Sequence, residues 1–274
     1  MSVTYILHGC VEQWDPSRQA MRMYAPAERL RRHLETRSEP YVDPDDGGDG
    51  DVLTVDDSTR GAAQACLMAR ELGHAVTLFV NPSQIISGRD YWFSRFDALV
   101  DARQAATAAF AGSTYDLRTR QGLYDFRWAV RPRLLAADED SAHRLLDEVA
   151  ALLQAEQAEV PDFARSIGSD ELDELRRAGV RFGNHGWNHQ CITSLSAAGQ
   201  HAHIADTARW LEEATGQSPR DYAVPYGQAR LGPQARAAVP GNIYLVGSAT
   251  QSGVAEDGSI YRRNLTPELQ SAQG

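Results

Sequence analysis

Residues 54–59, with the sequence TVDDST, place two adjacent carboxylates directly after a short apolar segment. Residues 51–55 have the β-branched content and the length of a buried strand. Small and apolar residues then recur at helical spacing over residues 59–72, and a glycine follows as a helix stop. Asp56 and Asp57 are therefore predicted in a strand-to-helix turn, where α/β proteins build binding sites. When the pair is considered without the rest of the chain, the alternative is that one aspartate caps the helix and the other is solvated.

A second apolar strand is predicted at residues 74–80. Strand, helix and strand in this order make a βαβ unit, which requires a parallel sheet. The pattern continues with strands predicted at residues 3–7, 180–182, 221–224, 243–246 and 259–262 and helices at residues 26–35, 169–179 and 196–215. The chain is therefore predicted to be an α/β protein.

Residues 85–165 interrupt this alternation, because they are rich in Ala and Arg and show no obvious strand. Helical periodicity is present at residues 96–110 and 141–155. We interpret the region as a helical excursion within a single catalytic domain spanning residues 1–274. Its aromatic side chains are predicted to serve in packing or, alternatively, as a lid. They are Tyr91, Trp92, Tyr124, Phe126 and Trp128.

The composition limits the classes of function. The 274 residues, 42% of them hydrophobic, are enough for a sizeable core. A formal net charge of −10 argues against nucleic acid or an anionic membrane surface as a partner. The chain contains no lysine, which excludes phosphate-loop and Schiff-base lysines. Three widely spaced cysteines and the lack of an apolar run of roughly 18 residues predict a cytoplasmic protein.

Two histidines, His185 and His189, follow the strand predicted at residues 180–182. Their spacing lets both imidazoles reach one metal ion, although nearby glycines predict a loop rather than a helix. Two histidines at this spacing, with no other evidence, are as often structural as metal-binding. Here it follows a strand, as the aspartate pair does, so both groups can meet at one end of the sheet. Two imidazoles, one carboxylate and a second carboxylate as general base would make a hydrolytic metal site.

Three motifs in this order resemble the polysaccharide deacetylases, also called NodB-like proteins or carbohydrate esterase family 4. Residues 54–58 (TVDDS) resemble Thr-Phe-Asp-Asp-Gly, and residues 185–189 (HGWNH) resemble His-Ser/Thr-x-x-His, with Gly186 in the Ser/Thr position. Residues 224–227 (VPYG) resemble the third motif. The resemblance extends from about residue 3 to residue 265. It implies a distorted (β/α)7 barrel of the NodB-homology type with a helical insertion.

The resemblance also implies a role for each site residue. Asp57, His185 and His189 would bind one divalent metal ion, with zinc favoured and cobalt, nickel, manganese or iron as alternatives. Asp56 would be the base that takes a proton from the attacking water, and the backbone N–H of Tyr226 would help to hold the oxyanion. The implied reaction is hydrolysis of an N-acyl amide, most often an acetamide of an amino sugar. The expected substrate is a small molecule or an oligosaccharide.

Two features of the family pattern differ in this chain. Ala223 stands where many members have the arginine that orients the base, and Arg262 is the nearest match to a later arginine that other members use, with a plain surface arginine as the alternative. The late Leu-x-His motif, whose histidine protonates the leaving amine, is absent, since no histidine follows His203. Asp56, His8 or water would then supply that proton.

The sequence therefore predicts a metal-dependent N-deacetylase, a hydrolase of non-peptide C–N bonds. Two alternatives share its fold, namely a non-catalytic carbohydrate-binding relative and an amidohydrolase of a non-sugar amide. A structural or interaction protein is a further alternative, but it leaves the aspartate pair and the two histidines unexplained. The missing late histidine and Ala223 favour the non-catalytic relative, whereas the retained metal-site side chains argue against it.

Overall fold

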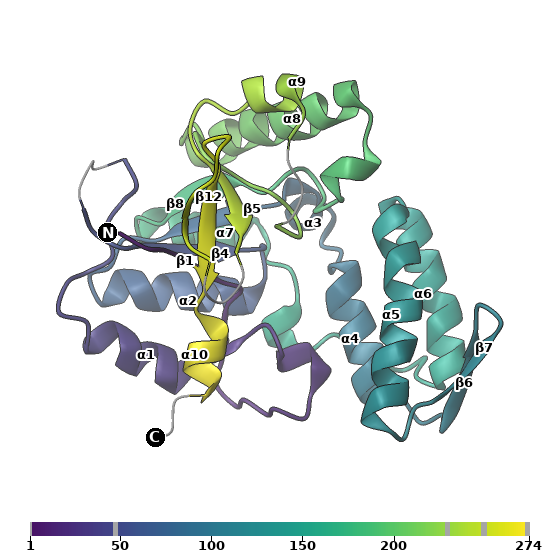
Figure 1. Ribbon diagram of the computed structural model, residues 1–274. Helices are drawn as coiled ribbons and strands as arrows, with labels where there is room; N and C mark the ends of the chain where they lie inside the picture. Colours follow the sequence, from purple (N-terminus) through teal and green to yellow (C-terminus); the bar gives the residue numbers. More distant parts are fainter. Residues whose placement is uncertain (1, 46–48, 228–230, 248–250, 272–274) are drawn as a thin grey trace. The chain divides into compact units, whose positions relative to one another are not determined.

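The computed structural model describes residues 2–45, 49–227, 231–247 and 251–271 (Figure 1). Its contacts divide the chain into two compact units. The first, which we call the barrel unit, comprises Met1–Asp15, Met23–Arg89 and Ser166–Gly274. The second, which we call the helical unit, comprises Pro16–Arg22 and Asp90–Arg165. The helical unit contains most of the region that the sequence predicts as a helical excursion.

Seven parallel strands close into a barrel in the barrel unit. Around the barrel they follow the order β1, β4, β5, β8, β9, β10, β12, and β12 pairs with β1 to close the ring. Their bounds are Thr4–Leu7 (β1), Val52–Asp56 (β4), Thr77–Val80 (β5), Arg181–Asn184 (β8), Tyr222–Ala223 (β9), Ile243–Val246 (β10) and Ile260–Asn264 (β12). A short strand, β11 (Gly253–Val254), pairs with β12 in the antiparallel direction. The predicted (β/α)7 barrel is confirmed.

Helices follow the barrel strands, as the βαβ pattern requires. They are α1 (Ala27–Glu35), α2 (Arg60–Glu71), α3 (Pro82–Ser87), α7 (Ser169–Arg177), α8 (Ala197–Thr215), α9 (Pro233–Ala237) and α10 (Thr266–Ser271). Two short strands, β2 (Cys10–Val11) and β3 (Ala25–Pro26), form a separate pair, and a 3-10 turn lies at Ile192–Ser194.

The sequence explains where α2 begins and how it packs. The hydroxyl of Thr59, the N-cap, accepts a hydrogen bond from the Ala62 N–H at 3.2 Å. Ala62, Ala65 and Ala69 make a narrow buried face that packs in the same core as Val55 of β4. This helix fixes the turn in which the two aspartates lie.

The helical unit is built from α4 (Trp92–Ala102), α5 (Arg120–Ala136) and α6 (Glu139–Leu153), which pack side by side in Figure 1. Short 3-10 turns lie at Gln19–Met21 and Asp162–Ala164. The core of the unit is almost wholly apolar. It includes Phe96, Leu99, Phe126, Leu146 and Val149.

The prediction that this region lacks strands is wrong, because β6 (Thr107–Phe110) and β7 (Ser113–Asp116) form an antiparallel hairpin. The helix predicted over residues 96–110 ends at Ala102. Two of the four residues of β6 (TAAF) are alanine, the strongest helix former, so its composition hides the strand. Ala111 and Gly112 both have positive φ, at 52° and 80°, as a tight hairpin turn requires.

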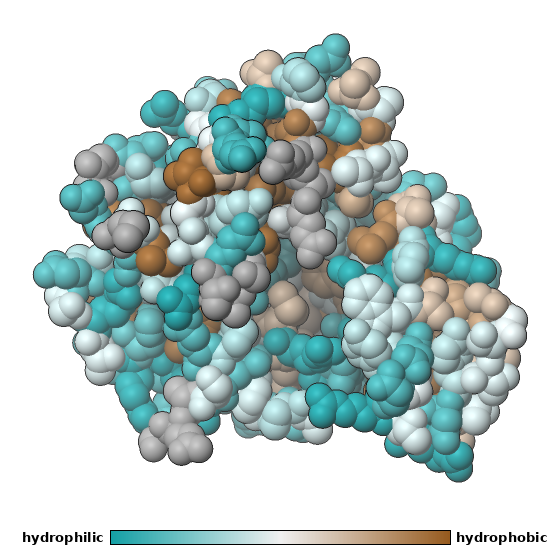
Figure 2. All heavy atoms as spheres, viewed as in Figure 1, coloured by the Kyte–Doolittle hydropathy of each residue, from teal (hydrophilic) through white to brown (hydrophobic). Residues whose placement is uncertain are grey.

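The five aromatic residues of this region have different environments. Tyr91 and Phe126 are buried, which agrees with the predicted packing role, and Trp92 is partly buried against the core. Tyr124 and Trp128 are 49% and 51% exposed. In Figure 2, hydrophobic side chains on the visible face occur in small separate patches among hydrophilic ones. Across the described residues, every helix is too short or too polar to span a membrane.

Candidate active site

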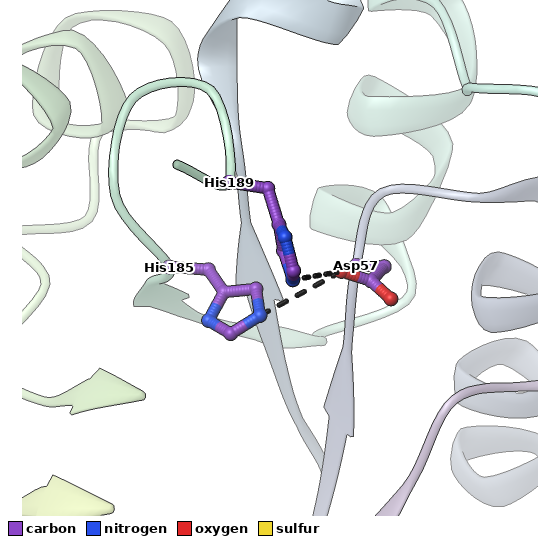
Figure 3. Close-up of side chains that lie close together, drawn as sticks. All are labelled: Asp57, His185 and His189. Atoms are coloured by element: carbon purple, nitrogen blue, oxygen red, sulfur yellow. Dashed lines mark ion pairs between the residues drawn. The ribbon is translucent and has the colours of Figure 1, made fainter. Parts of the chain in front are cut away.

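The aspartate and histidine motifs meet at the carboxyl end of the barrel strands. Asp56 ends β4, and the parallel pairing of β4 with β5 and of β5 with β8 brings the end of β8 to the same level. His185 follows β8 directly. Figure 3 shows that His185 and His189 point toward Asp57 from the loop after β8. The expected convergence of the two motifs is present in the structure.

Asp57, His185 and His189 form a compact set of metal-ligand atoms. His189 Nε2 and His185 Nε2 lie 3.2 Å and 3.6 Å from Asp57 Oδ1. The three ligand atoms lie within 4.8 Å of one another, and all three residues are buried. Asp57 Oδ1 has no hydrogen-bond partner among the described residues. A buried oxygen without a partner beside two imidazole nitrogens fits a divalent metal ion.

Three hydrogen bonds around His185 orient the metal-site loop. His185 Nδ1 lies 2.8 Å from the carbonyl oxygen of Ala223, and this contact requires the proton on Nδ1 and leaves the Nε2 lone pair facing Asp57. The side-chain amide of Asn81 donates to the carbonyl oxygens of His185 and Gly186 at 2.6 Å and 2.9 Å. Asn81 was not among the predicted site residues, because its contact with His185 spans 104 residues, although its position directly after β5 is a signal that could have identified it.

Backbone strain is concentrated at this site. Asp57, His189 and Tyr226 have φ values of 72°, 56° and 62°, in the left-handed region that non-glycine residues rarely adopt. Each such residue costs of order 1 kcal/mol or more and persists only where its surroundings hold it. This strain is expected where the backbone must direct several side chains toward one point.

Asp56 is bound by a buried arginine from the last barrel strand. Arg262 Nη1 and Nη2 donate to Asp56 Oδ1 and Oδ2 at 2.6 Å and 2.7 Å, and Arg262 is 0% exposed. Its guanidinium also donates to Thr54 Oγ1 at 3.1 Å and lies near the rings of Phe79 and Tyr244. The structure therefore places Arg262 on the predicted base, and the alternative of a surface arginine is wrong. This bidentate geometry fixes the carboxylate in one orientation.

The two adjacent carboxylates have opposite pKa shifts. Burial favours the neutral form of Asp56, but the charges of Arg262 and His185 and the Arg262 hydrogen bonds outweigh it and lower the Asp56 pKa to about 2. Burial and then the Asp56 charge raise the pKa of Asp57 well above its usual range. Burial lowers the pKa of both His185 and His189. At neutral pH, Asp56 is thus a carboxylate and both imidazoles are neutral, as ligands must be.

His8 lies beside Asp56. β1 pairs with β4 so that Leu7 is opposite Val55, which brings His8 to the level of Asp56. His8 Nδ1 is buried and has no hydrogen-bond partner among the described residues. Burial lowers the His8 pKa to about 4, while the charge of Asp56 opposes this shift. His8 is therefore a titratable group at the site.

Gly186 departs from the family motif for a steric reason. Its φ is 76°, and a Cβ added there would lie 2.1 Å from Nε2 of His203 on α8. His203 is buried, and its imidazole fills the space that a side chain at position 186 would need. The sequence did not predict this role, because the contact joins a loop to a helix 17 residues later.

Tyr226 lies next to the metal-ligand set. The Gly227 N–H donates to the carbonyl oxygen of Val224 at 2.8 Å, which closes the turn that carries Tyr226. The Tyr226 ring packs edge-on against His189, with centroids 4.6 Å apart. The turn is therefore at the site, and the oxyanion role of the Tyr226 N–H stays a prediction.

Comparisons with solved structures show the fold. The deacetylase PplD of Streptococcus pyogenes, solved with acetate, has a TM-score of 0.60 at 11% identity, with 100% of this chain and 98% of PplD covered. IcaB of Ammonifex degensii has a TM-score of 0.55 at 12% identity, covering 98% and 94%. The BpsB deacetylase domain of Bordetella bronchiseptica has a TM-score of 0.52 at 13% identity, covering 96% and 95%. No curated protein sequence matches the chain significantly.

The sequence itself matches the polysaccharide deacetylase family over residues 46–238. This range contains the aspartate pair, both histidines and Tyr226, whereas His8 and Arg262 lie outside it. Members of the family depend on a metal ion, and the triad described above offers the ligands for one. The chain therefore belongs to the polysaccharide deacetylase family and is a hydrolase that removes an acyl group from an N-acylated, sugar-containing substrate.

Proposed function

We propose that the barrel unit removes the acetyl group from an N-acetylated amino sugar, with a zinc ion bound by Asp57, His185 and His189. The observation that carries the proposal is the burial of this ligand set beside the pair of Asp56 and Arg262. Two imidazole nitrogens and one carboxylate oxygen suit zinc, although cobalt, nickel, manganese and iron accept the same donors. When bound, the ion would polarise the acyl carbonyl and acidify a water molecule.

Asp56 is proposed to orient the attacking water and to receive its proton. The two hydrogen bonds from Arg262 hold the carboxylate in one orientation and keep it ionised. A pKa of about 2 makes it a weak base, so its contribution depends on position more than on basicity. The N–H of Tyr226 is proposed to stabilise the oxyanion that forms on the former carbonyl oxygen.

His8 is proposed to protonate the leaving amine, since this chain lacks the late histidine of the family. Its position at the level of Asp56 supports this role. The proton that water loses when it attacks the carbonyl must reach the amine nitrogen when the C–N bond breaks, and an imidazole beside Asp56 can carry it. Asp56 itself is the alternative donor.

Leaving-group dependence separates these two donors. His8→Gln should lower kcat by about 100-fold or more on an acetamide, whose amine needs a proton. It should change kcat by less than about threefold on 4-nitrophenyl acetate, because nitrophenolate leaves without one. An equal loss on both substrates would assign His8 to binding or structure instead.

Metal content and acetate release test the proposal as a whole. Wild-type protein should bind about one zinc ion per chain, whereas Asp57→Ala and His185→Ala should bind almost none, by elemental analysis after dialysis. His201→Ala, which removes an exposed histidine from α8, is the matched control and should keep its metal. Asp56→Asn should keep its metal and lose acetate release from N-acetylated sugars by about 1,000-fold. Zinc-free wild type would refute the site, and an active Asp56→Asn would refute the base.

We also propose a cytoplasmic location. Cys10 and Cys66 are buried free thiols, and burial raises the pKa of Cys10 to about 12, so both thiols stay protonated and unreactive. Free cysteines suit a reducing compartment. Immunodetection in separated cell fractions tests this, and recovery in the extracellular fraction would contradict it.

A further inference from the structure

A small pocket in the helical unit combines aromatic and cationic side chains. It has a volume of about 220 Å³ and is lined by five aromatic side chains, three arginines and one aspartate. All of its lining residues belong to the helical unit. A volume of this size holds a single small ring rather than a large ligand.

Two of the aromatic side chains are exposed at the pocket. Tyr124 and Trp128 lie four residues apart on α5, with ring centroids 5.9 Å apart. In the described part of the helical unit, they are the two large hydrophobic side chains that stand exposed. Exposed aromatic pairs that line a pocket mark a binding surface, and the apolar face of a sugar ring packs well on an indole or phenol ring.

The lining also carries positive charge. Arg22, Arg127 and Arg131 oppose Asp97, so the lining has a net charge of 3 − 1 = +2 in a chain whose net charge is −10. Arg127 lies 2.6 Å from Asp97 and forms an ion pair with it. Arg131 lies over the Trp128 ring, 5.7 Å from its centroid. Guanidinium groups beside an aromatic platform suit a carboxylate or a phosphate.

We propose that this pocket binds one acidic sugar residue of a glycan. The sugar ring packs between Trp128 and Tyr124, whose ring planes are inclined by 58°, and its carboxylate or phosphate accepts hydrogen bonds from Arg131 and Arg22. The inference rests on the proposed function in that the glycan is the substrate class of the barrel unit. A glycan bound by the helical unit is present at a raised local concentration for the active site of the same polypeptide.

Direct binding tests the pocket without turnover. Isothermal titration at low salt compares a hyaluronan hexasaccharide, which has alternating carboxylates, with neutral chitohexaose, and N-acetylglucosamine 6-phosphate supplies a phosphate arm. The hyaluronan fragment or the phosphate should bind the wild-type chain at least tenfold more tightly than chitohexaose, and raised salt should weaken that binding. Tighter binding of one of the two acidic probes shows whether the pocket prefers a carboxylate or a phosphate.

Variants locate the binding to the pocket. Trp128→Ala and Arg131→Gln should each weaken binding of the preferred acidic probe at least tenfold. Arg118→Gln removes an exposed arginine of the same unit that does not line the pocket, and it should change the affinity less than twofold. Circular dichroism verifies that each variant is folded. The proposal is overturned if neither acidic probe binds, or if both pocket variants bind as wild type does.

The catalytic variant separates this proposal from the proposed function. Asp56→Asn should bind the acidic probe as wild type does, because Asp56 belongs to the barrel unit. Intact binding together with absent acetate release from every substrate would refute the proposed function alone. Normal acetate release together with no binding of either acidic probe would refute the pocket alone.

Discussion

The two units of this chain bury different kinds of groups. The barrel unit buries Arg262, Asp56 and Asp57, whereas the core of the helical unit consists of hydrocarbon and aromatic side chains. Burying charge costs free energy that a pair recovers only with good geometry, and burying apolar surface stabilises directly. The barrel unit therefore gives up stability to hold a site, whereas the helical unit is stabilised by its core. Four predictions test this contrast.

The largest effect is expected from breaking the buried ion pair. Arg262→Gln leaves Asp56 buried without its partner, and we expect a loss of roughly 3–5 kcal/mol in the free energy of unfolding. We also expect kcat/KM to fall by about 100-fold or more, because the base loses its orientation. Urea denaturation and acetate release measure the two effects.

The double variant Asp56→Leu with Arg262→Met sharpens this test. Replacing a buried ion pair with apolar groups of similar size is often neutral for stability, so the double variant should recover most of the lost stability and none of the activity. A single Arg262→Gln variant as stable as wild type would contradict the idea that the barrel unit is destabilised by its own buried charge.

An apolar deletion in the helical unit should cost stability without loss of metal. Phe126→Ala removes a fully buried ring from that core, and we expect a loss of about 3–5 kcal/mol. Tyr124→Ala on the same helix is the matched control and should cost less than about 1 kcal/mol, because Tyr124 is exposed. Thermal unfolding and elemental analysis measure both effects. Loss of bound metal in folded Phe126→Ala would show that the site depends on this core.

A smaller effect is expected where the metal-site loop meets α8. Gly186→Ser restores the family motif but collides with His203, and we expect about 1–3 kcal/mol of destabilisation and roughly tenfold weaker metal binding. Adding His203→Ala should relieve the collision and recover part of the loss. The positive φ of Gly186 limits that recovery. A competition assay with a chelator measures the affinity, and no recovery in the double variant would exclude the steric explanation.

The smallest effect concerns pH. Burial lowers the pKa of His203 from 6.5 to about 4, so the unfolded chain binds this proton more tightly than the folded chain does. The stabilisation is therefore complete above pH 6.5 and is lost progressively as the pH falls toward 4. Unfolding of metal-free His203→Asn should depend less steeply on pH, by roughly 1 kcal/mol between pH 6.5 and 5.5. If urea denaturation gave the same change in the free energy of unfolding with pH for both proteins, the assignment to His203 would be contradicted.

The convergence of the aspartate and histidine motifs can be predicted from the sequence because each motif is short. Asp56 and Asp57 are neighbours, and His185 and His189 are four residues apart, so each group is visible as a local pattern. Strand-end placement then predicts that the two groups meet, as they do. Arg262 was found only through a resemblance, because 206 residues separate it from Asp56.

The remaining features depend on contacts that no local pattern records. Asn81 supports the histidine loop across the barrel, and His203 fills the space above Gly186 from another element. The β6–β7 hairpin was missed because alanine-rich strands resemble helices in composition, and the pairing between strands decides the outcome. The exposure of Tyr124 and Trp128 likewise follows from how α5 packs, which an aromatic spacing alone does not determine.

The arginine that binds Asp56 is supplied by the strand that closes the barrel. β12 carries Arg262, pairs with β1 and is the last strand of the chain among the described residues. During synthesis from the amino terminus, Asp56 therefore emerges long before the arginine that holds it. A chain interrupted before β12 would have an open sheet and an unpaired carboxylate at the same time. Closure of the barrel and pairing of Asp56 therefore both wait for synthesis of β12.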